Sequence, residues 1–267
     1  MTDLSNGGYS RLDRPEILMR LFHPRPDYGV RERAENAFDV LIPVEGDIAV
    51  SGCFHMAGKS APNLLFFHGN GEIAGDYDEF GPLYNHGGMN FLVVDYRGYG
   101  GSNGSPTVSN MMRDCHTVFE FAERWLKGKG YGGALIVMGR SLGSASALEL
   151  ICRHKNRING LVLESSFAHT ASLLEFLGVN GSEIGFTEEK GFRNLDKIRT
   201  WDKKTLMIHA EFDHFFRFSE AQALFDVCPS RFKTLLKIPG ADHNDIFMRG
   251  FDAYLRAVKT LCEDRES

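Results

Sequence analysis

The chain has 267 residues, of which 43% are hydrophobic and 24% are charged, and its formal net charge is −5. These proportions are those of ordinary soluble globular proteins, and a chain of this length can bury a large core without disulfides or metals. Because the charge balance is slightly acidic, it offers no basic surface to nucleic acid or to anionic lipid. We therefore expect no nucleic-acid partner.

Five cysteines are scattered along the chain without a CxxC pair, which predicts neither a disulfide framework nor a structural zinc site. The first residues carry neither the basic start nor the apolar stretch of a secretory signal, and the apolar runs are too short to cross a bilayer. We expect a soluble, cytoplasmic protein without an integral membrane segment.

The chain begins with a polar segment, residues 1–36, in which three prolines interrupt any long helix. We expect this segment to be an irregular arm or a short helix lying on the domain. Two extended segments, 38–43 and 48–54, then flank a Glu-Gly-Asp turn and indicate a β-hairpin. No repeat or Pro/Gly-rich linker divides the chain, so residues 1–267 are expected to form a single domain.

After the hairpin, short apolar segments alternate with amphipathic ones. In residues 108–127, methionine, valine and phenylalanine recur at helical spacing, which predicts a helix. The short segments are apolar on both faces, as are the strands of a covered parallel sheet. The alternation predicts an α/β fold with a mostly parallel sheet of about eight strands and helices on both faces. The expected strands of this region are residues 63–67, 90–94, 133–138, 159–163, 205–208 and 234–238.

One connection is longer than a crossover requires. About forty residues separate the strand that ends near Glu164 from the strand that begins near Thr205, and leucine and phenylalanine residues around Leu173 and Phe176 make part of it apolar. We interpret residues 168–200 as a small lid over a pocket. An ordinary crossover helix with a long loop is the alternative.

Functional side chains of such a fold gather where its strands end. One predicted strand runs into GRSLG at residues 139–143, and a helix-forming segment follows. This is the context of a nucleophile elbow, which raises a serine above the sheet on a sharp turn. We predict that Ser141 is a catalytic nucleophile. The same pattern recurs at residues 100–104, but Pro106 blocks the helix that Ser102 would need, so we interpret Ser102 as a loop residue.

A serine hydroxyl needs a base, and the base needs an orienting carboxylate. In this fold the partners follow the serine in the order acid, then histidine. Two later strands are predicted to end just before Asp213 and His243, to which we assign these roles. Glu211, Asp242 and Glu164 compete for the role of acid. Asp242 is badly placed to bond the neighbouring ring of His243, whereas Glu164 ends the preceding strand and could replace Asp213.

An oxyanion hole requires two backbone N–H groups. One is expected from Leu142, the residue after the nucleophile, and the other from Asn70 in a glycine-rich loop after an early strand. A glycine-rich turn without substrate contact is the alternative for this loop. We interpret His209 and His214 as structural.

Four segments together resemble the α/β-hydrolase superfamily: FHGNGE at 67–72, DYRGYG at 95–100, GRSLG at 139–143 and GADHND at 240–245. They are most similar to its BEM46-like, serine aminopeptidase S33-like group, and the resemblance covers about residues 38–261.

The resemblance implies a triad of Ser141, Asp213 and His243, oxyanion donors at Asn70 and Leu142, and no chemistry for the DYRGYG segment. The chain departs from the group at the position before the histidine, which is usually small and here is Asp242. Many members begin with a membrane-anchoring segment, which we do not expect here, so membrane attachment is not carried over.

The sequence therefore predicts a serine hydrolase that cleaves a carboxylic ester of a small or lipid-like acyl substrate, through an acyl-enzyme and without a metal or organic cofactor. A peptidase with the same residues is the nearest alternative, in which Glu72 or Glu164 would hold a substrate amine. A binding protein on a retained hydrolase scaffold is the alternative outside enzymology. The acyl group and the oligomeric state are left open.

Overall fold

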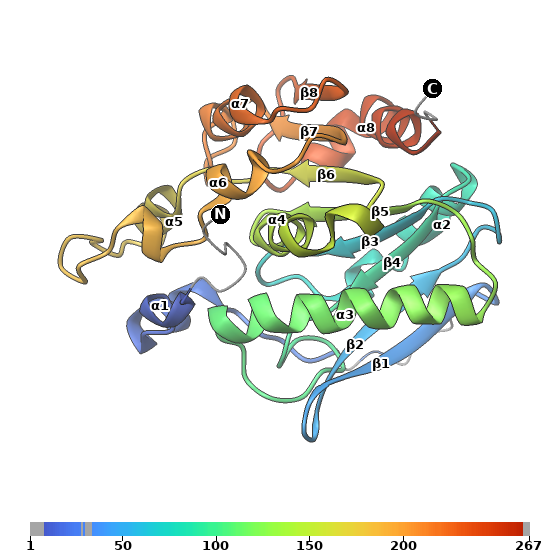
Figure 1. Ribbon diagram of the computed structural model, residues 1–267, viewed down its shortest axis with the longest axis horizontal. Coiled ribbons are helices and arrows are strands. Elements are labelled where there is room, and N and C mark those ends of the chain that lie inside the picture. The colour runs from blue at the N-terminus through green and yellow to red at the C-terminus, as the bar shows by residue number, and fades with distance from the viewer. Residues whose placement is uncertain (1–7, 28, 30–33, 264–267) are drawn as a thin grey trace.

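The computed structural model describes residues 8–27, 29 and 34–263. Its centre is an eight-stranded sheet with the strand order β1-β2-β4-β3-β5-β6-β7-β8 (Figure 1). The pairs from β4 to β8 are all parallel, whereas β2 is antiparallel to both of its neighbours. The predicted mostly parallel α/β sheet is therefore confirmed.

The strand boundaries agree with the sequence pattern to within one or two residues, which is the usual uncertainty at element ends. Two of the expected strands, β3 and β4, coincide with the predicted segments. The strands are β1 (Ala37–Glu45), β2 (Ile48–His55), β3 (Asn63–Phe67), β4 (Asn90–Val94), β5 (Leu135–Arg140), β6 (Gly160–Glu164), β7 (Lys204–Ala210) and β8 (Lys233–Ile238).

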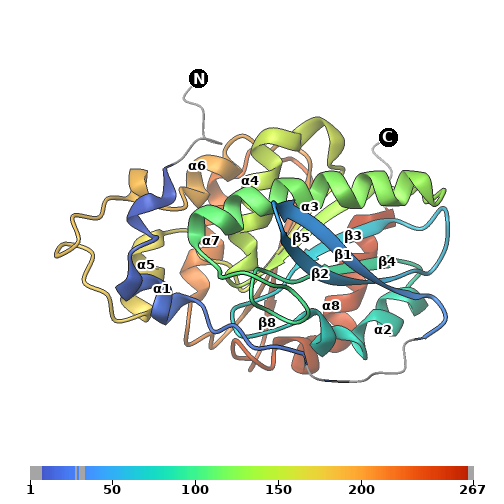
Figure 2. The ribbon, with the colours of Figure 1, turned by 90° about the horizontal axis from the view of Figure 1, so that it is seen from below.

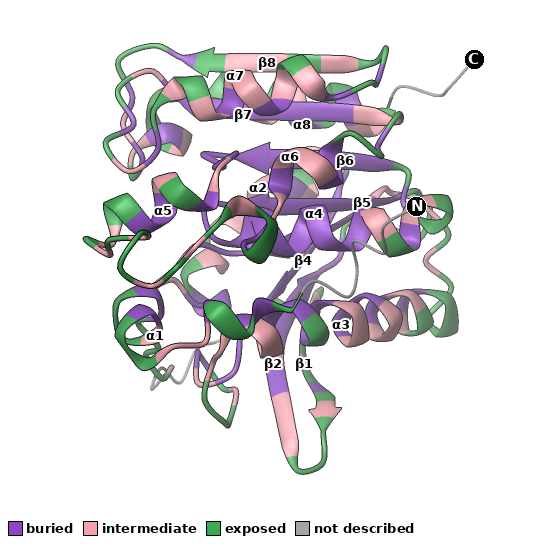
Figure 3. Cartoon of the chain, turned by 60° about the vertical axis from the view of Figure 1, so that its left-hand side comes forward, coloured by how far each residue is buried: buried purple, intermediate pink, exposed green. Residues whose placement is uncertain are grey.

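Strands β3 to β6 bury both of their faces, whereas the edge strands β1 and β8 are partly exposed. Successive side chains of a strand point to opposite sides of the sheet. Leu65 and Phe67 of β3 belong to one hydrophobic cluster, and Leu64 and Phe66 belong to the other. Helices α3, α4 and α7 cover the first face, and α2 and α8 cover the second (Figure 2). The central strands β5 and β6 are buried along their whole length (Figure 3).

The helices are α1 (Pro15–Leu21), α2 (Phe80–His86), α3 (Val108–Gly128), α4 (Gly143–His154), α5 (Thr170–Phe176), α6 (Asn194–Ile198), α7 (Phe218–Val227) and α8 (Ile246–Glu263). Within the part of the chain that the structure describes, no helix has both the length and the apolar character that crossing a membrane requires.

Residues 168–200, the predicted lid, contain α5 and α6. Two carboxylates fix the beginning of α5: Glu220 of α7 accepts hydrogen bonds from the N–H groups of Ala168 and His169, and Glu188 accepts from the next two. Acidic groups suit this position because the first N–H groups of a helix lack partners within it. These bonds anchor the start of α5.

The far end of α5 meets the N-terminal arm, part of which forms the short helix α1, one of the two forms expected from the sequence (Figure 1). Arg20 of α1 donates a hydrogen bond to the carbonyl of Leu177, just after α5, at 2.9 Å. Two segments far apart in the sequence thus lie side by side above the carboxyl ends of the strands.

A buried ion pair joins α4 to α6 on one face of the sheet. Lys197 lies 2.6 Å from the Glu149 carboxylate, and each side chain is only 1% exposed. The hydroxyl of Tyr9 donates to Glu149 and accepts from Lys197. Burial alone would raise the pKa of Glu149, but Lys197 and these hydrogen bonds lower it to about 2.

Lys197→Met should therefore destabilise the fold by roughly 3–5 kcal/mol, because it leaves the carboxylate of Glu149 buried without its charged partner. Urea unfolding at neutral pH measures this difference. Lys259→Met removes an exposed cation from α8 and should change the stability by no more than about 0.5 kcal/mol. Equal unfolding midpoints for the two variants would contradict the prediction.

Candidate active site

Ser141 lies at the point where β5 turns into α4. The strand ends at Arg140, α4 begins at Gly143, and Ser141 between them has a φ angle of 51°. This left-handed conformation costs a residue with a side chain roughly 1–2 kcal/mol. Hydrogen bonds hold it in place: the N–H of Ser141 donates to the backbone carbonyl of Glu164, and the N–H and hydroxyl of Ser144 donate to the carbonyl of Ser141.

The glycines on either side of this turn are required by backbone contacts. A Cβ atom at Gly139 would lie 2.4 Å from the carbonyl oxygen of Gly143, and one at Gly143 would lie 2.1 Å from that of Phe67. Both distances are far shorter than any stable contact. The start of α4 can therefore pack against the end of β3, where the glycine-rich loop of residues 68–72 begins.

His243 follows β8, and Asp213 follows β7, as the sequence predicts. Nδ1 of His243 lies 2.8 Å from Oδ2 of Asp213, and both side chains are buried. The other carboxylate oxygen of Asp213 accepts from the N–H groups of Phe215 and Phe216 at 2.9 and 2.8 Å. The carboxylate is thereby fixed in position, and the bond to Nδ1 leaves Nε2 as the ring nitrogen for other partners.

The surroundings of His243 favour its neutral form. Burial lowers the pKa of the imidazole most, and the charge of Arg140 lowers it further, whereas the bond to Asp213 acts in the opposite direction. The ring of Phe215 stacks on the imidazole with a centroid separation of 4.3 Å. A neutral imidazole with an oriented ring is suited to accept a proton.

Asn70 lies in the loop of residues 68–72, and its side chain is bound on two sides. Its Oδ1 accepts from the hydroxyl of Tyr99 at 2.7 Å and from the N–H of His23 at 3.0 Å. Nearby, the hydroxyl of Tyr96 donates to the carbonyl of His68. The DYRGYG segment, to which the sequence assigned no chemistry, therefore fixes the backbone of this loop.

A cavity of about 250 Å³ is lined by Ser141 and His243. Asn70 and Leu142 line it as well, so it brings together four of the five predicted site residues, and Asp213 contacts His243 from behind. Other walls come from α1 and the residues after it, from the end of α5 and from the loop after β7: Arg20, Leu21, His23, Leu173, Phe176, Leu177, Phe215 and Phe216. Beside the predicted residues, Gly69, Gly71, Glu72, Arg140 and Asn244 complete the lining. The sequence did not indicate that the N-terminal arm forms part of this cavity.

The competing acids bind elsewhere. Glu164 is held by Arg140, the carboxylate of Asp242 accepts from the N–H of Asn244, and that of Glu211 accepts from the N–H of Gly240. Of the four acids considered for the triad, only Asp213 contacts the imidazole of His243 in the hydrogen bonds of the described residues.

The remaining candidates have structural contacts. Ser102 lies in a loop and accepts a hydrogen bond from the N–H of Ser51. His209 is buried and its ring bonds the carbonyl of Phe216. Its Nε2 lies 3.6 Å from the carboxylate of Asp213, so it packs against the acid. His214 is exposed at the surface.

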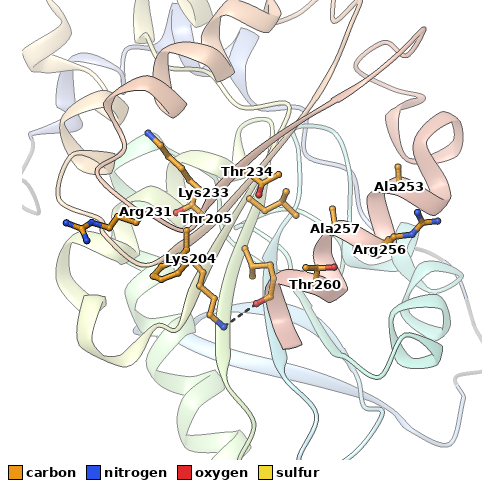
Figure 4. A pocket seen from close by; sticks show the side chains of 12 residues that line it. Lys204, Thr205, Arg231, Lys233, Thr234, Ala253, Arg256, Ala257 and Thr260 are labelled. Atoms are coloured by element: carbon orange, nitrogen blue, oxygen red, sulfur yellow. Dashed lines mark hydrogen bonds between the residues drawn. The ribbon is translucent and has the colours of Figure 1, made fainter. Parts of the chain in front are cut away.

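A larger cavity of about 520 Å³ lies where β7 and β8 begin, beside α8 (Figure 4). Its cations include Lys204, which reaches the carbonyl of Leu261, and Lys233, which is bound to two carbonyls. Ser141, by contrast, follows the carboxyl end of a strand. The larger cavity therefore lies at the amino ends of the strands, on the opposite side of the sheet from Ser141, Asp213 and His243.

Comparison with known proteins identifies relatives of the chain. The model of the serine aminopeptidase S33 family matches residues 58–179, which include Asn70 and Ser141 and end before Asp213. Protein bem46 of Schizosaccharomyces pombe is 30% identical over 215 residues, which are 78% of this chain and 69% of that protein. Human alpha/beta hydrolase domain-containing protein 17B is 29% identical over 75% of this chain and 67% of its own length.

Solved structures share the fold at low sequence identity. The esterase Pf2001 of Pyrococcus furiosus superposes with a TM-score of 0.70 at 18% identity, covering 90% of this chain and 97% of that one. A soluble variant of the monoglyceride lipase of Saccharomyces cerevisiae reaches a TM-score of 0.63, also at 18% identity, covering 84% and 96% of the two chains. The relationship to bem46 shows that the chain belongs to the BEM46-like group of α/β-hydrolases, and its sheet has the fold of these solved structures.

Proposed function

We propose that the protein is a serine hydrolase that cleaves carboxylic esters through a covalent acyl-enzyme at Ser141. The observation that carries the proposal is the bond between His243 and Asp213, made beside the cavity that also contains Ser141. Family membership supports a hydrolase activity. An esterase and a lipase among proteins of the same fold are consistent with an ester substrate.

In the proposed reaction His243 accepts the hydroxyl proton of Ser141 while the serine oxygen attacks the carbonyl carbon of the substrate. Backbone N–H groups of Leu142, at the start of α4, and of Asn70 then stabilise the oxyanion. His243 protonates the leaving alcohol, and water repeats the sequence on the acyl-enzyme. Asp213 holds the imidazole in the required tautomer and stabilises its positive charge.

An ester is favoured over a peptide by the partners of two glutamates. A peptidase that binds a free amine needs an unpaired carboxylate near the scissile bond. Glu72 and Glu164 were the residues considered for that role, and both bind the guanidinium of Arg140 at 2.8 and 3.0 Å. The leucine and phenylalanine side chains of the cavity wall provide an apolar surface suited to an acyl chain.

Ser141→Ala should abolish labelling by a fluorophosphonate probe, because the probe reacts only with an activated serine oxygen. Gel fluorescence after a short incubation measures the label. Ser102→Ala is the matched control, since it changes the serine of the second G-x-S-x-G pattern, and it should label like wild type. A labelled Ser141→Ala protein would contradict the proposal, and an unlabelled wild type would favour the non-catalytic alternative.

Asp213→Asn should lower kcat at neutral pH by roughly 10³- to 10⁴-fold, because the amide stabilises the wrong tautomer of His243. Hydrolysis of p-nitrophenyl esters measures the loss. Asp242→Asn keeps an oxygen that can accept from the N–H of Asn244 and should stay within about threefold of wild type. A larger loss of kcat in Asp242→Asn than in Asp213→Asn would contradict the assignment of Asp213 as the acid that orients His243.

The pH profile should report the neutral state of His243. Because the pKa of this residue is lowered, kcat/KM should remain high down to a pH below the ordinary histidine value and fall only under it. The hydrolysis assay also tests the substrate class. We expect p-nitrophenyl esters of increasing acyl chain length to be hydrolysed, and aminoacyl amides to be hydrolysed much more slowly. A preference for the amides would support the peptidase alternative instead.

A further inference from the structure

Arg140, the residue before the proposed nucleophile, is a buried cation that contacts three separate segments. Its Nε donates to Glu72 after β3 at 2.8 Å, and one terminal nitrogen donates to Glu164 at the end of β6 at 3.0 Å. The other terminal nitrogen donates to the backbone carbonyl of His243 at 3.0 Å. Only 8% of this residue is exposed, so water contributes little to its solvation.

The network continues from Glu72 into the glycine-rich loop. One oxygen of Glu72 binds Arg140, and the other accepts from the N–H of Gly69 at 2.6 Å and from the hydroxyl of Tyr77 at 2.7 Å. Gly69 immediately precedes Asn70, the proposed oxyanion donor. One guanidinium is therefore linked to the loop of the base and, through one carboxylate, to the loop of the oxyanion hole.

We propose that Arg140 is a positioning residue, which holds the loop of His243 and the loop of Asn70 at fixed distances from Ser141. The proposal rests on the proposed function, since it assigns a role in that same site. Arg140 is the last residue of β5 and is bonded to Ser141 through the backbone, so it cannot move without moving the serine. Binding both loops to it makes the serine, the base and the oxyanion donor parts of one rigid unit.

The guanidinium group is needed for its shape as well as its charge. Arginine presents planar, fork-shaped donors that can bind three oxygens in fixed directions, whereas a lysine ammonium is a point charge on a flexible stem. The charge also matters, because two carboxylates flank it, the half-buried Glu72 and the buried Glu164. Burial tends to raise the pKa of Glu72, but Arg140 and the hydrogen bonds lower it to about 2. Burial raises the pKa of Glu164, which Tyr254 also contacts.

Arg140 also acts on His243 through its charge. The charged groups that act most on this imidazole are Asp213 after β7, Arg140 at the end of β5 and Glu72 after β3, with His209 behind Asp213. Arg20 and His23 of the N-terminal arm line the same cavity. Arg140 lowers the pKa of His243, while Asp213 and Glu72 raise it. Loss of Arg140 should therefore raise the pKa and move the acid limb of the kcat/KM profile to higher pH.

The test compares three variants with wild type in the hydrolysis of p-nitrophenyl acetate from pH 5 to pH 9. Arg140→Met removes the charge and the fork, and kcat should fall about 100-fold, the order expected when a catalytic group is displaced by about 1 Å. The acid limb should move up by roughly one pH unit. Arg140→Lys keeps the charge without the fork, so its acid limb should match wild type while kcat stays at least about tenfold lower.

Lys197→Met is the matched control for the loss of a buried cation, because Lys197 binds Glu149 outside the active-site cavity. It should lower the melting temperature but leave kcat and the acid limb as in wild type at 25 °C. Melting temperatures of all variants confirm that each is folded during the assay. If Arg140→Met does not fold, the profile of Arg140→Lys decides the question, since its low kcat with an unshifted limb separates geometry from charge.

The outcomes separate the inference from the function on which it rests. A wild-type protein that neither hydrolyses the ester nor takes a fluorophosphonate label overturns the proposed function. An active wild type with Arg140 variants of unchanged kcat and unchanged acid limb overturns the positioning role alone. A loss of kcat in Lys197→Met as large as that in Arg140→Met would show a general effect of stability, and it would overturn the inference as well.

Discussion

The close approach of three backbones at one turn is the constraint on which the site depends. The end of β5, the start of α4 and the end of β3 meet where Gly139 and Gly143 leave no room for a Cβ atom. At this turn Ser141 has its left-handed conformation, and it lines the same cavity as the loop of residues 68–72. A side chain at either glycine would separate the serine from this loop, so the chemistry and the packing of the core depend on the same atoms.

Much of the sheet could be predicted from the sequence because its signal is local. The strands of a covered parallel sheet are short apolar runs on both faces, and β3 and β4 end where their runs end. The positions of Ser141, Asp213 and His243 at strand ends follow from the same regularity, because the carboxyl ends of parallel strands share one edge. Context distinguished Ser141 from Ser102 by the helix that follows one and not the other.

The parts that the sequence did not indicate are contacts between segments distant in the chain. Arg20 and His23 line the cavity because α1 folds against the end of α5, and no periodicity in a polar arm predicts such a contact. Tyr96 and Tyr99 hold the loop of Asn70 through hydrogen bonds of their hydroxyl groups. The pattern of apolar residues does not indicate these bonds. Glu72 and Glu164 could be selected as carboxylates near the site, but their common partner Arg140 is visible only in three dimensions.

The central claim is that Ser141 carries the acyl group during turnover, and mass spectrometry of an acid-quenched reaction tests it most directly. The protein is mixed with p-nitrophenyl acetate, quenched within the burst of product release and digested with trypsin, which cleaves after Arg140. The account predicts an acetyl group on the peptide of residues 141–153, with fragment ions that place it on the first residue, Ser141. An acetyl group confined to another residue, or none despite hydrolysis, would contradict it.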